Sequence, residues 1–219
     1  MILKLLLLDW RSLDIYRYYA MLMIIVSFIF GIIYSILLIP YGVFFALTFS
    51  VNTFYVEDKF ELNKLSLILP VSRKNIVLAR YTFCFILVLL CITISASLMP
   101  VVRIYSLSKW YFDWGGYAAL IALGILIFSI FNLAMYPFLF KLGYKKGKIL
   151  GYFIPCAFFG ILFIAYLIVS NYYPAMTIEF ISFASDNLLL VSGGMIAAAV
   201  VLLLLSFYLS LRIYSRRDF

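Results

Sequence analysis

Histidine is absent from this chain of 219 residues, and cysteine occurs only three times. Without histidine, the chain cannot form an HExxH metal site or a Ser-His or Cys-His catalytic pair. Cys84, Cys91 and Cys156 all lie within apolar runs. On one helix the first two would be separated by about 10.5 Å, too far for a disulfide. We therefore expect the cysteines to be small apolar packing residues.

Charge is also scarce. Charged residues make up 12% of the chain, half the share of about 25% in a soluble domain, and hydrophobic residues make up 67%. This composition predicts an all-α integral membrane protein. The net charge of +8 does not point to a nucleic-acid partner, because in a membrane protein the placement of the basic residues matters more than their sum.

Long intervals without charge set the number of membrane crossings. Tyr18 to Val56 would measure about 58 Å as one helix, twice the thickness of the hydrocarbon core. It must hold two crossings, and Pro40-Tyr41-Gly42 is its only strong breaker. We expect the third helix to end near Pro100. The chain is then a single transmembrane domain, 1–219, with six transmembrane helices: residues 18–39, 41–56, 82–102, 114–140, 149–170 and 187–211.

The basic residues give the orientation. Fifteen of the 17 lysines and arginines fall on one side of this six-helix layout, and only Arg103 and Lys109 fall on the other. By the positive-inside rule, the N- and C-termini are expected to be cytoplasmic. The outer segments carry the aromatic residues of an interfacial belt, such as Trp110, Trp114 and Tyr172.

Two further segments are expected to lie at the membrane surface. Residues 1–17 predict an interfacial amphipathic helix with Leu6 and Trp10 on its apolar side, although Asp9 interrupts the pattern. The alternative is an extension of the first transmembrane helix. Residues 175–186 are too short to span and predict an outer re-entrant or interfacial segment. Its acids, Glu179 and Asp186, are expected at the headgroup level, with no role assigned.

Close helix contacts are expected at small residues in the apolar runs. No clear GxxxG pair stands out among Gly31, Gly124, Gly160 and the Gly193–Gly194 pair. Asn52 lies one turn before the first charged cluster. A buried asparagine in a membrane helix usually bonds a neighbouring helix, and substrate contact is the alternative.

Residues 57–80 are the longest polar interruption between apolar runs. Pro70 breaks any helix there, Ser72 is a good N-cap, and a helix is expected to restart at Arg73. The segment therefore predicts a short amphipathic helix, a break and a restart. An ordinary solvated loop is the alternative.

The pattern of Glu57 and Glu61, followed by Leu67-Ile68-Leu69-Pro70-Val71-Ser72-Arg73-Lys74 and Ala79-Arg80-Tyr81, resembles the permease subunits of ABC-2 type ATP-binding-cassette transporters, the type V exporter fold. The likeness extends over essentially the whole chain. Within the family, the sequence is similar to small bacterial permeases that export phenol-soluble modulins or antimicrobial peptides. The resemblance implies a bacterial plasma-membrane exporter of an amphipathic or hydrophobic cargo, working by alternating access.

The resemblance also implies partners and a site. Residues 57–80 would contain the coupling helix that docks on a cytosolic ATPase, present in two copies and binding the ATP and Mg²⁺. A second permease copy, identical or related, would complete the path within the lipid. The implied coupling residues are Glu57, Phe60, Glu61, Leu65, Pro70, Val71, Ser72 and Arg73.

The sequence also bears on four other functions: ATP hydrolysis, ion-coupled transport, membrane-enzyme catalysis and self-protection. The chain holds no GxxxxGK[ST] motif, so it is not expected to hydrolyse ATP and is expected to be a non-catalytic subunit with no cofactor or metal of its own. An ion-coupled secondary transporter usually needs ionisable groups near the bilayer midplane, and none is expected in a helix centre. A membrane enzyme is disfavoured by the lack of paired acids. A self-protection (immunity) permease of the same family stays open.

Overall fold

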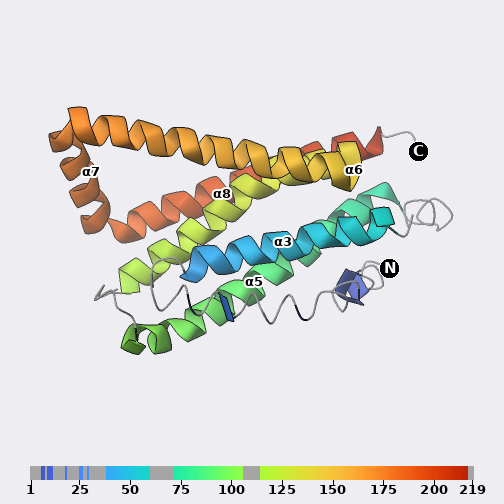
Figure 1. The fold of residues 1–219 in the computed structure, drawn as a ribbon, viewed down its shortest axis with the longest axis horizontal. Coiled ribbons are helices and arrows are strands. Elements are labelled where there is room, and N and C mark those ends of the chain that lie inside the picture. Colours follow the sequence, from blue (N-terminus) through green and yellow to red (C-terminus); the bar gives the residue numbers. More distant parts are fainter. Residues whose placement is uncertain are drawn as a thin grey trace.

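The computed structural model describes residues 6, 7, 9–11, 18, 25, 26, 29, 38–59, 72–105 and 114–216. Nearly all of these residues are helical and no strand occurs among them, which confirms the all-α prediction. The long helices run side by side, and one short helix crosses an end of the bundle (Figure 1). The helices are α3 (Leu38–Lys59), α5 (Arg73–Tyr105), α6 (Trp114–Tyr172), α7 (Pro174–Asp186) and α8 (Leu188–Ser215).

α6 is a pair of antiparallel helices that meet at Gly143. As one straight helix, its 59 residues would measure about 88 Å, almost three times the thickness of the hydrocarbon core. Gly143 has φ 75° and ψ −177°, a region that essentially only glycine occupies. The chain reverses there, as the yellow part of Figure 1 shows, so each half of α6 can cross the membrane once.

By length and composition, four of the described helices can cross a membrane: α3, α5, α6 and α8. α8 exposes large apolar side chains that would face lipid, among them Leu189, Leu190 and Leu204, which are 64–74% exposed. The first expected helix, residues 18–39, lies largely outside the described residues, so the count of six crossings stays a prediction. α7 lies over the range expected for the outer interfacial segment.

Two expectations about proline were wrong. α3 begins at Leu38, so Pro40 sits in its first turn, where the missing N–H has no helical partner to lose. The residues expected to end the first helix, Leu38 and Ile39, therefore belong to α3. α5 also continues through Pro100 to Tyr105. Proline is tolerated inside membrane helices because neighbouring groups can satisfy the carbonyl that it leaves free.

The two halves of α6 approach each other closely at their backbones. A Cβ on Gly147 would lie 2.8 Å from the carbonyl oxygen of Phe138, and one on Gly151 would lie 2.9 Å from the Cα of Met135. These two glycines form a GxxxG pair, so the expectation that the chain has no such pair was wrong. Among the glycines expected at contacts, Gly124 packs against α3, whereas three have open space around them: Gly160, Gly193 and Gly194.

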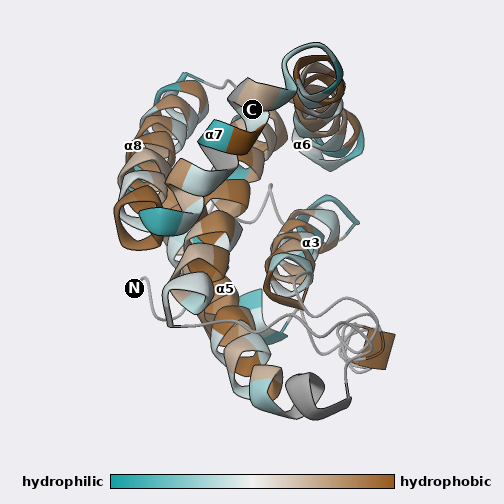
Figure 2. Cartoon of the chain, turned by 90° about the vertical axis from the view of Figure 1, so that its left-hand side faces the viewer, coloured by the Kyte–Doolittle hydropathy of each residue, from teal (hydrophilic) through white to brown (hydrophobic). Residues whose placement is uncertain are grey.

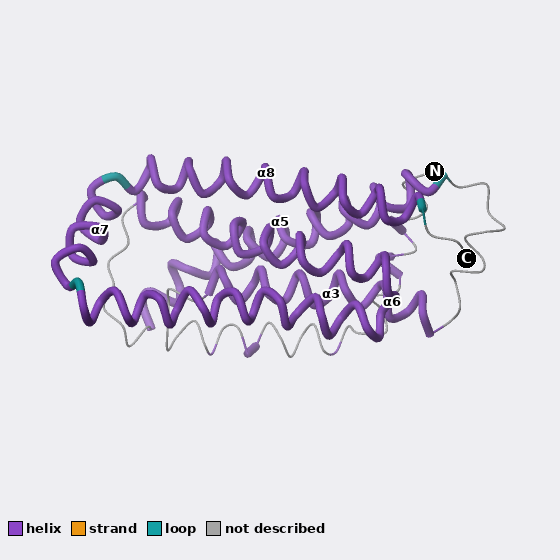
Figure 3. Tube along the Cα trace, turned by 90° about the horizontal axis from the view of Figure 1, so that it is seen from above, coloured by secondary structure: helices purple, strands orange, loops and turns teal. Residues whose placement is uncertain are grey.

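The core lies between α3, α5 and α6. Its largest fully buried side chains include Leu47, Phe83, Tyr136 and Leu139. Hydrophobic residues cover most of each long helix (Figure 2), so both the core and the lipid-facing surface are apolar. The bundle has one end where α3 and α8 finish, α5 starts and α6 reverses, called here the basic end; α7 lies at the opposite end (Figure 3).

Candidate functional site

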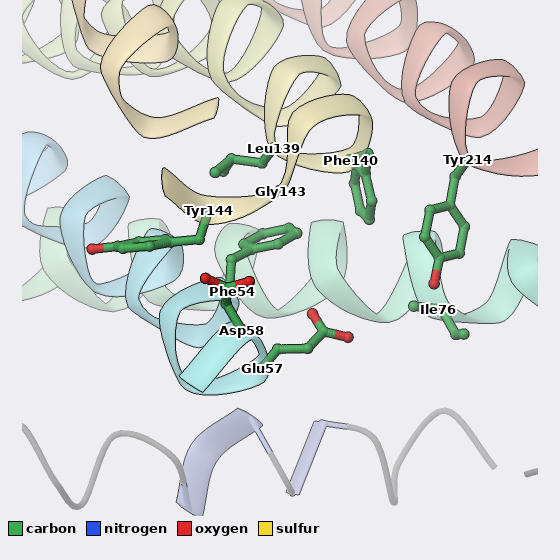
Figure 4. A pocket seen from close by; sticks show the side chains of 9 residues that line it. All are labelled: Phe54, Glu57, Asp58, Ile76, Leu139, Phe140, Gly143, Tyr144 and Tyr214. Carbon is green, nitrogen blue, oxygen red and sulfur yellow. The ribbon is translucent and has the colours of Figure 1, made fainter. Parts of the chain in front are cut away.

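Four helices meet at the basic end around a small pocket. α3 contributes Phe54, Glu57 and Asp58, the turn of α6 contributes Gly143 and Tyr144, and single residues come from α5 and α8 (Figure 4). Acidic side chains line this pocket, although most charges at this end are basic. The exposed basic residues there include Lys59, Lys74, Lys141, Lys145, Lys146, Lys148, Arg212 and Arg216. This end of the bundle therefore combines a dense positive surface with an acidic interior.

Arg80 lies at the centre of that interior. Its Nη1 donates to Asp9 Oδ1 at 2.6 Å, and its Nη2 donates to Glu57 Oε2 at 3.0 Å. Only 11% of the Arg80 side chain is exposed, and its guanidinium lies 5.0 Å from the ring centroid of Phe54. The cluster of Asp9, Arg80 and Glu57 thus ties the N-terminal segment to the end of α3 and the start of α5.

Two carboxylates share one cation in this cluster, so its formal charge is −1. Asp9 is buried, and burial, together with the negative charge of Glu57, raises its pKa to about 6 against the opposing effect of Arg80. One added proton would neutralise the cluster. The cluster can therefore lose its negative charge in mildly acidic conditions. Asp9 and Glu57 both bind the guanidinium of Arg80.

The cluster also joins the two ends of the predicted coupling segment, residues 57–80. Glu57 comes three residues before residue 60, and Arg80 comes nine residues after residue 71, so their ion pair joins the two flanks of residues 60–71. The sequence shows Arg80 within the motif Ala79-Arg80-Tyr81 and Asp9 as an interruption of an amphipathic pattern, and it predicts no partner for either. Their opposite signs in otherwise apolar surroundings were the signal that could have identified them as partners.

Arg73 binds the end of another helix. Its Nη1 donates to the backbone carbonyl oxygens of Ser215 at 2.8 Å and Tyr214 at 3.5 Å, the last residues of α8. A cation at a helix C-terminus satisfies carbonyls that lack helical partners and interacts favourably with the helix dipole. α5 starts at Arg73, as expected, and the Ser72 carbonyl accepts from Asn75 N–H at 2.9 Å.

The predicted coupling residues are therefore only partly described. Glu57, Ser72 and Arg73 lie at the basic end, and they contact Arg80, the first turn of α5 and the end of α8 respectively. The other five lie outside the described residues: Phe60, Glu61, Leu65, Pro70 and Val71. Asn52 is half-buried in α3.

A second polar cluster lies deeper in the bundle and was not expected from the sequence. Tyr81 Oη bonds the hydroxyls of Ser206 at 2.6 Å and Ser210 at 2.8 Å, and Ser206 donates to Asn132 Oδ1 at 3.0 Å. Ser50 bonds the hydroxyl of Tyr136 in the same region. The bonds join α3 to α6, and α5 and α6 to α8. Such bonds between membrane helices stabilise their packing.

In the described part of the chain, no group of three or more cysteine, aspartate or glutamate side chains could hold a metal ion. Glu179 and Asp186 are both exposed on α7, at the end opposite to the Arg80 cluster.

Comparison with known families agrees with this architecture. The family described as ABC-2 family transporter protein matches residues 1–215, almost the whole chain. No curated protein and no solved structure matches the chain. With a match of this extent, the chain belongs to the ABC-2 family of transporter proteins.

Proposed function

We propose that this chain is the permease subunit of an ATP-driven exporter and that its basic end receives the force of the ATPase. Membership of the ABC-2 family makes it a membrane component that works with an ABC ATPase. The observation that carries the site assignment is the Arg80 cluster, because it joins both flanks of residues 60–71 to the N-terminal segment.

The orientation rests on charge. The lysines of the α6 turn and the arginines at the end of α8 lie at the same end as the start of α5. Basic residues near membrane-helix ends accumulate on the cytoplasmic side. The basic end is therefore the cytoplasmic end in this proposal, and residues 60–71 are accessible to a cytosolic ATPase.

The contacts at the basic end suggest how force would spread. A push on residues 60–71 would act on α3 and α5 together, because Glu57 and Arg80 join their ends. Arg73 would pass the displacement to α8 through the bonds to its last carbonyls. Asp9 would bring the N-terminal segment along. One local contact would then move three helices as a unit, as alternating access between two permease copies requires.

The cargo is proposed to be an amphipathic or hydrophobic peptide. The described charges lie at the basic end, on α7 and, with Arg103, near the end of α5, and the interior between them offers hydroxyl, amide and aromatic groups. This distribution does not favour an ion-coupled transporter, which needs ionisable groups near the midplane. A self-protection permease would use the same coupling and differ in its cargo.

The test is purification of the tagged chain from its native membrane in mild detergent, followed by mass spectrometry of the proteins that accompany it. We expect a stoichiometric ATPase with the unmodified chain, and loss of it or of ATPase-driven transport in Phe60→Ala and Glu61→Lys. Lys146→Ala, an exposed change at the turn of α6, is the matched control at the same end. Normal coupled transport in both segment variants would refute the site assignment.

A further inference from the structure

A groove separates α5 from α8 close to the basic end. Its walls are formed by Leu78, Thr82 and Phe85 on α5 and by Leu204 and its neighbours on α8, and the buried Phe128 of α6 forms its floor. The groove has a volume of about 320 Å³. Leu78 and Leu204 are exposed, so the groove opens to the surface of the bundle.

The groove offers almost no polar group to a ligand. Tyr81 lines it, but its hydroxyl is already bonded to Ser206 and Ser210, and its ring packs edge-on against Phe207 with centroids 5.3 Å apart. The Thr82 hydroxyl donates to the Leu78 carbonyl of its own helix at 2.8 Å. The walls are thus fixed by bonds within the protein, and the space between them suits an occupant without hydrogen-bonding groups.

Both walls carry a cation at the basic end. Lys74 is exposed and lies one turn before Leu78 on the same face of α5. Arg212 is exposed on α8 at the same end of the bundle, five residues after Phe207. An occupant whose apolar part fills the groove would therefore present its head to two positive charges.

We propose that this groove binds one acyl chain of an anionic phospholipid from the leaflet at the basic end, with the phosphate held by Lys74 and Arg212. The site goes beyond the proposed export function and does not depend on it. A lipid in this position would fill the space between two helices that move together in the proposed coupling.

The test uses tryptophan fluorescence in vesicles. In a background where Trp10, Trp110 and Trp114 are replaced by phenylalanine, Phe85→Trp reports on the groove. Phe158→Trp, on the outer face of α6, is the matched control, since the two phenylalanines are 49% and 46% exposed. Quenching is measured with brominated phosphatidylglycerol and brominated phosphatidylcholine, each mixed with its unbrominated form.

At Phe85→Trp we expect phosphatidylglycerol to bind about 5- to 25-fold more tightly than phosphatidylcholine, because each cation near the surface contributes about a factor of five. At Phe158→Trp the two lipids should be equivalent. Adding Lys74→Gln and Arg212→Gln should abolish the preference at Phe85→Trp. Equal binding of the two lipids at Phe85→Trp would overturn the proposal, because the groove would then hold ordinary surrounding lipid only. Protection from both lipids would also overturn it, because protein would then cover the groove.

Discussion

Arg80 and Asp9 are 71 residues apart in sequence, yet Arg80 Nη1 lies 2.6 Å from Asp9 Oδ1 in a buried site. This pair fixes an N-terminal segment against helices that enter the membrane. Glu57 binds the other arm of the same guanidinium, so Arg80 contacts carboxylates on both α3 and the N-terminal segment.

The first prediction concerns removal of that guanidinium. Arg80→Ala leaves two buried carboxylates without their cation, and we expect a loss of about 3–5 kcal/mol in the free energy of unfolding. Arg80→Lys should lose less, because it keeps the charge but not the planar fork that binds two carboxylates. Denaturation by SDS in mixed micelles measures both, with Lys146→Ala as an exposed control expected to stay within about 0.5 kcal/mol of the unmodified chain.

The second prediction concerns pH. The pKa of Asp9 is about 6 in the folded protein and 3.8 for an ordinary aspartate, so the folded state binds this proton more tightly. The contribution of Asp9 to stability is therefore greatest below about pH 4 and is lost as the pH rises through 6. We expect the stability of Asp9→Asn, relative to the unmodified chain, to increase between pH 4 and pH 6 and then to level off. A relative stability that falls over this interval would contradict the raised pKa.

The third prediction concerns the deeper polar cluster. Ser206→Ala removes the bonds to Tyr81 and Asn132 and should destabilise the bundle by about 1 kcal/mol. Ser97→Ala is the control, because the Ser97 hydroxyl donates to Ile94 of its own helix and is exposed. Equal effects of the two changes, in the same denaturation assay, would mean that the cluster does not join the helices energetically.

The fourth prediction concerns the α6 hairpin. Gly147→Ala places a methyl group 2.8 Å from the Phe138 carbonyl oxygen, so the halves of α6 must separate, at a cost of about 1–3 kcal/mol. Gly160→Ala meets open space and should be neutral or slightly stabilising. Thermal stability of the purified protein measures the contrast, and a neutral Gly147→Ala would refute the close packing.

Several features of the fold could be predicted from the sequence. Apolar runs predict membrane helices because the hydrocarbon core requires about 20 apolar residues, and the restart of helix at Arg73 follows from Pro70 and Ser72. Pro40 and Pro100 misled the prediction, because a proline ends a helix only where its missing N–H or its ring conflicts with the surroundings. The residues next to a proline in sequence do not show which groups pack around it in the folded bundle.

The candidate site was harder to predict. Glu57 and Arg73 were chosen by resemblance to a family, and their contacts at the basic end depend on how α3, α5 and α8 pack. Arg80 belongs to the motif Ala79-Arg80-Tyr81, but the sequence predicts no partner for it. Only the folded chain brings Asp9 to it. Serines such as Ser206 likewise carry no sequence signal for a bonding partner 74 residues away.

Gly143 selects for handedness and not for size. Among the described residues, no atom beyond the chain neighbours of Gly143 lies within 4 Å of the Cβ that a larger residue would add, so the restriction comes from φ 75° and ψ −177°. The φ and ψ of Gly143 are the mirror image of an extended, polyproline-like conformation of an L-residue. A D-amino acid would therefore adopt them at low energy. A semisynthetic protein with D-alanine at position 143 should therefore keep the reversal of α6, whereas L-alanine, with identical atoms, should strain it.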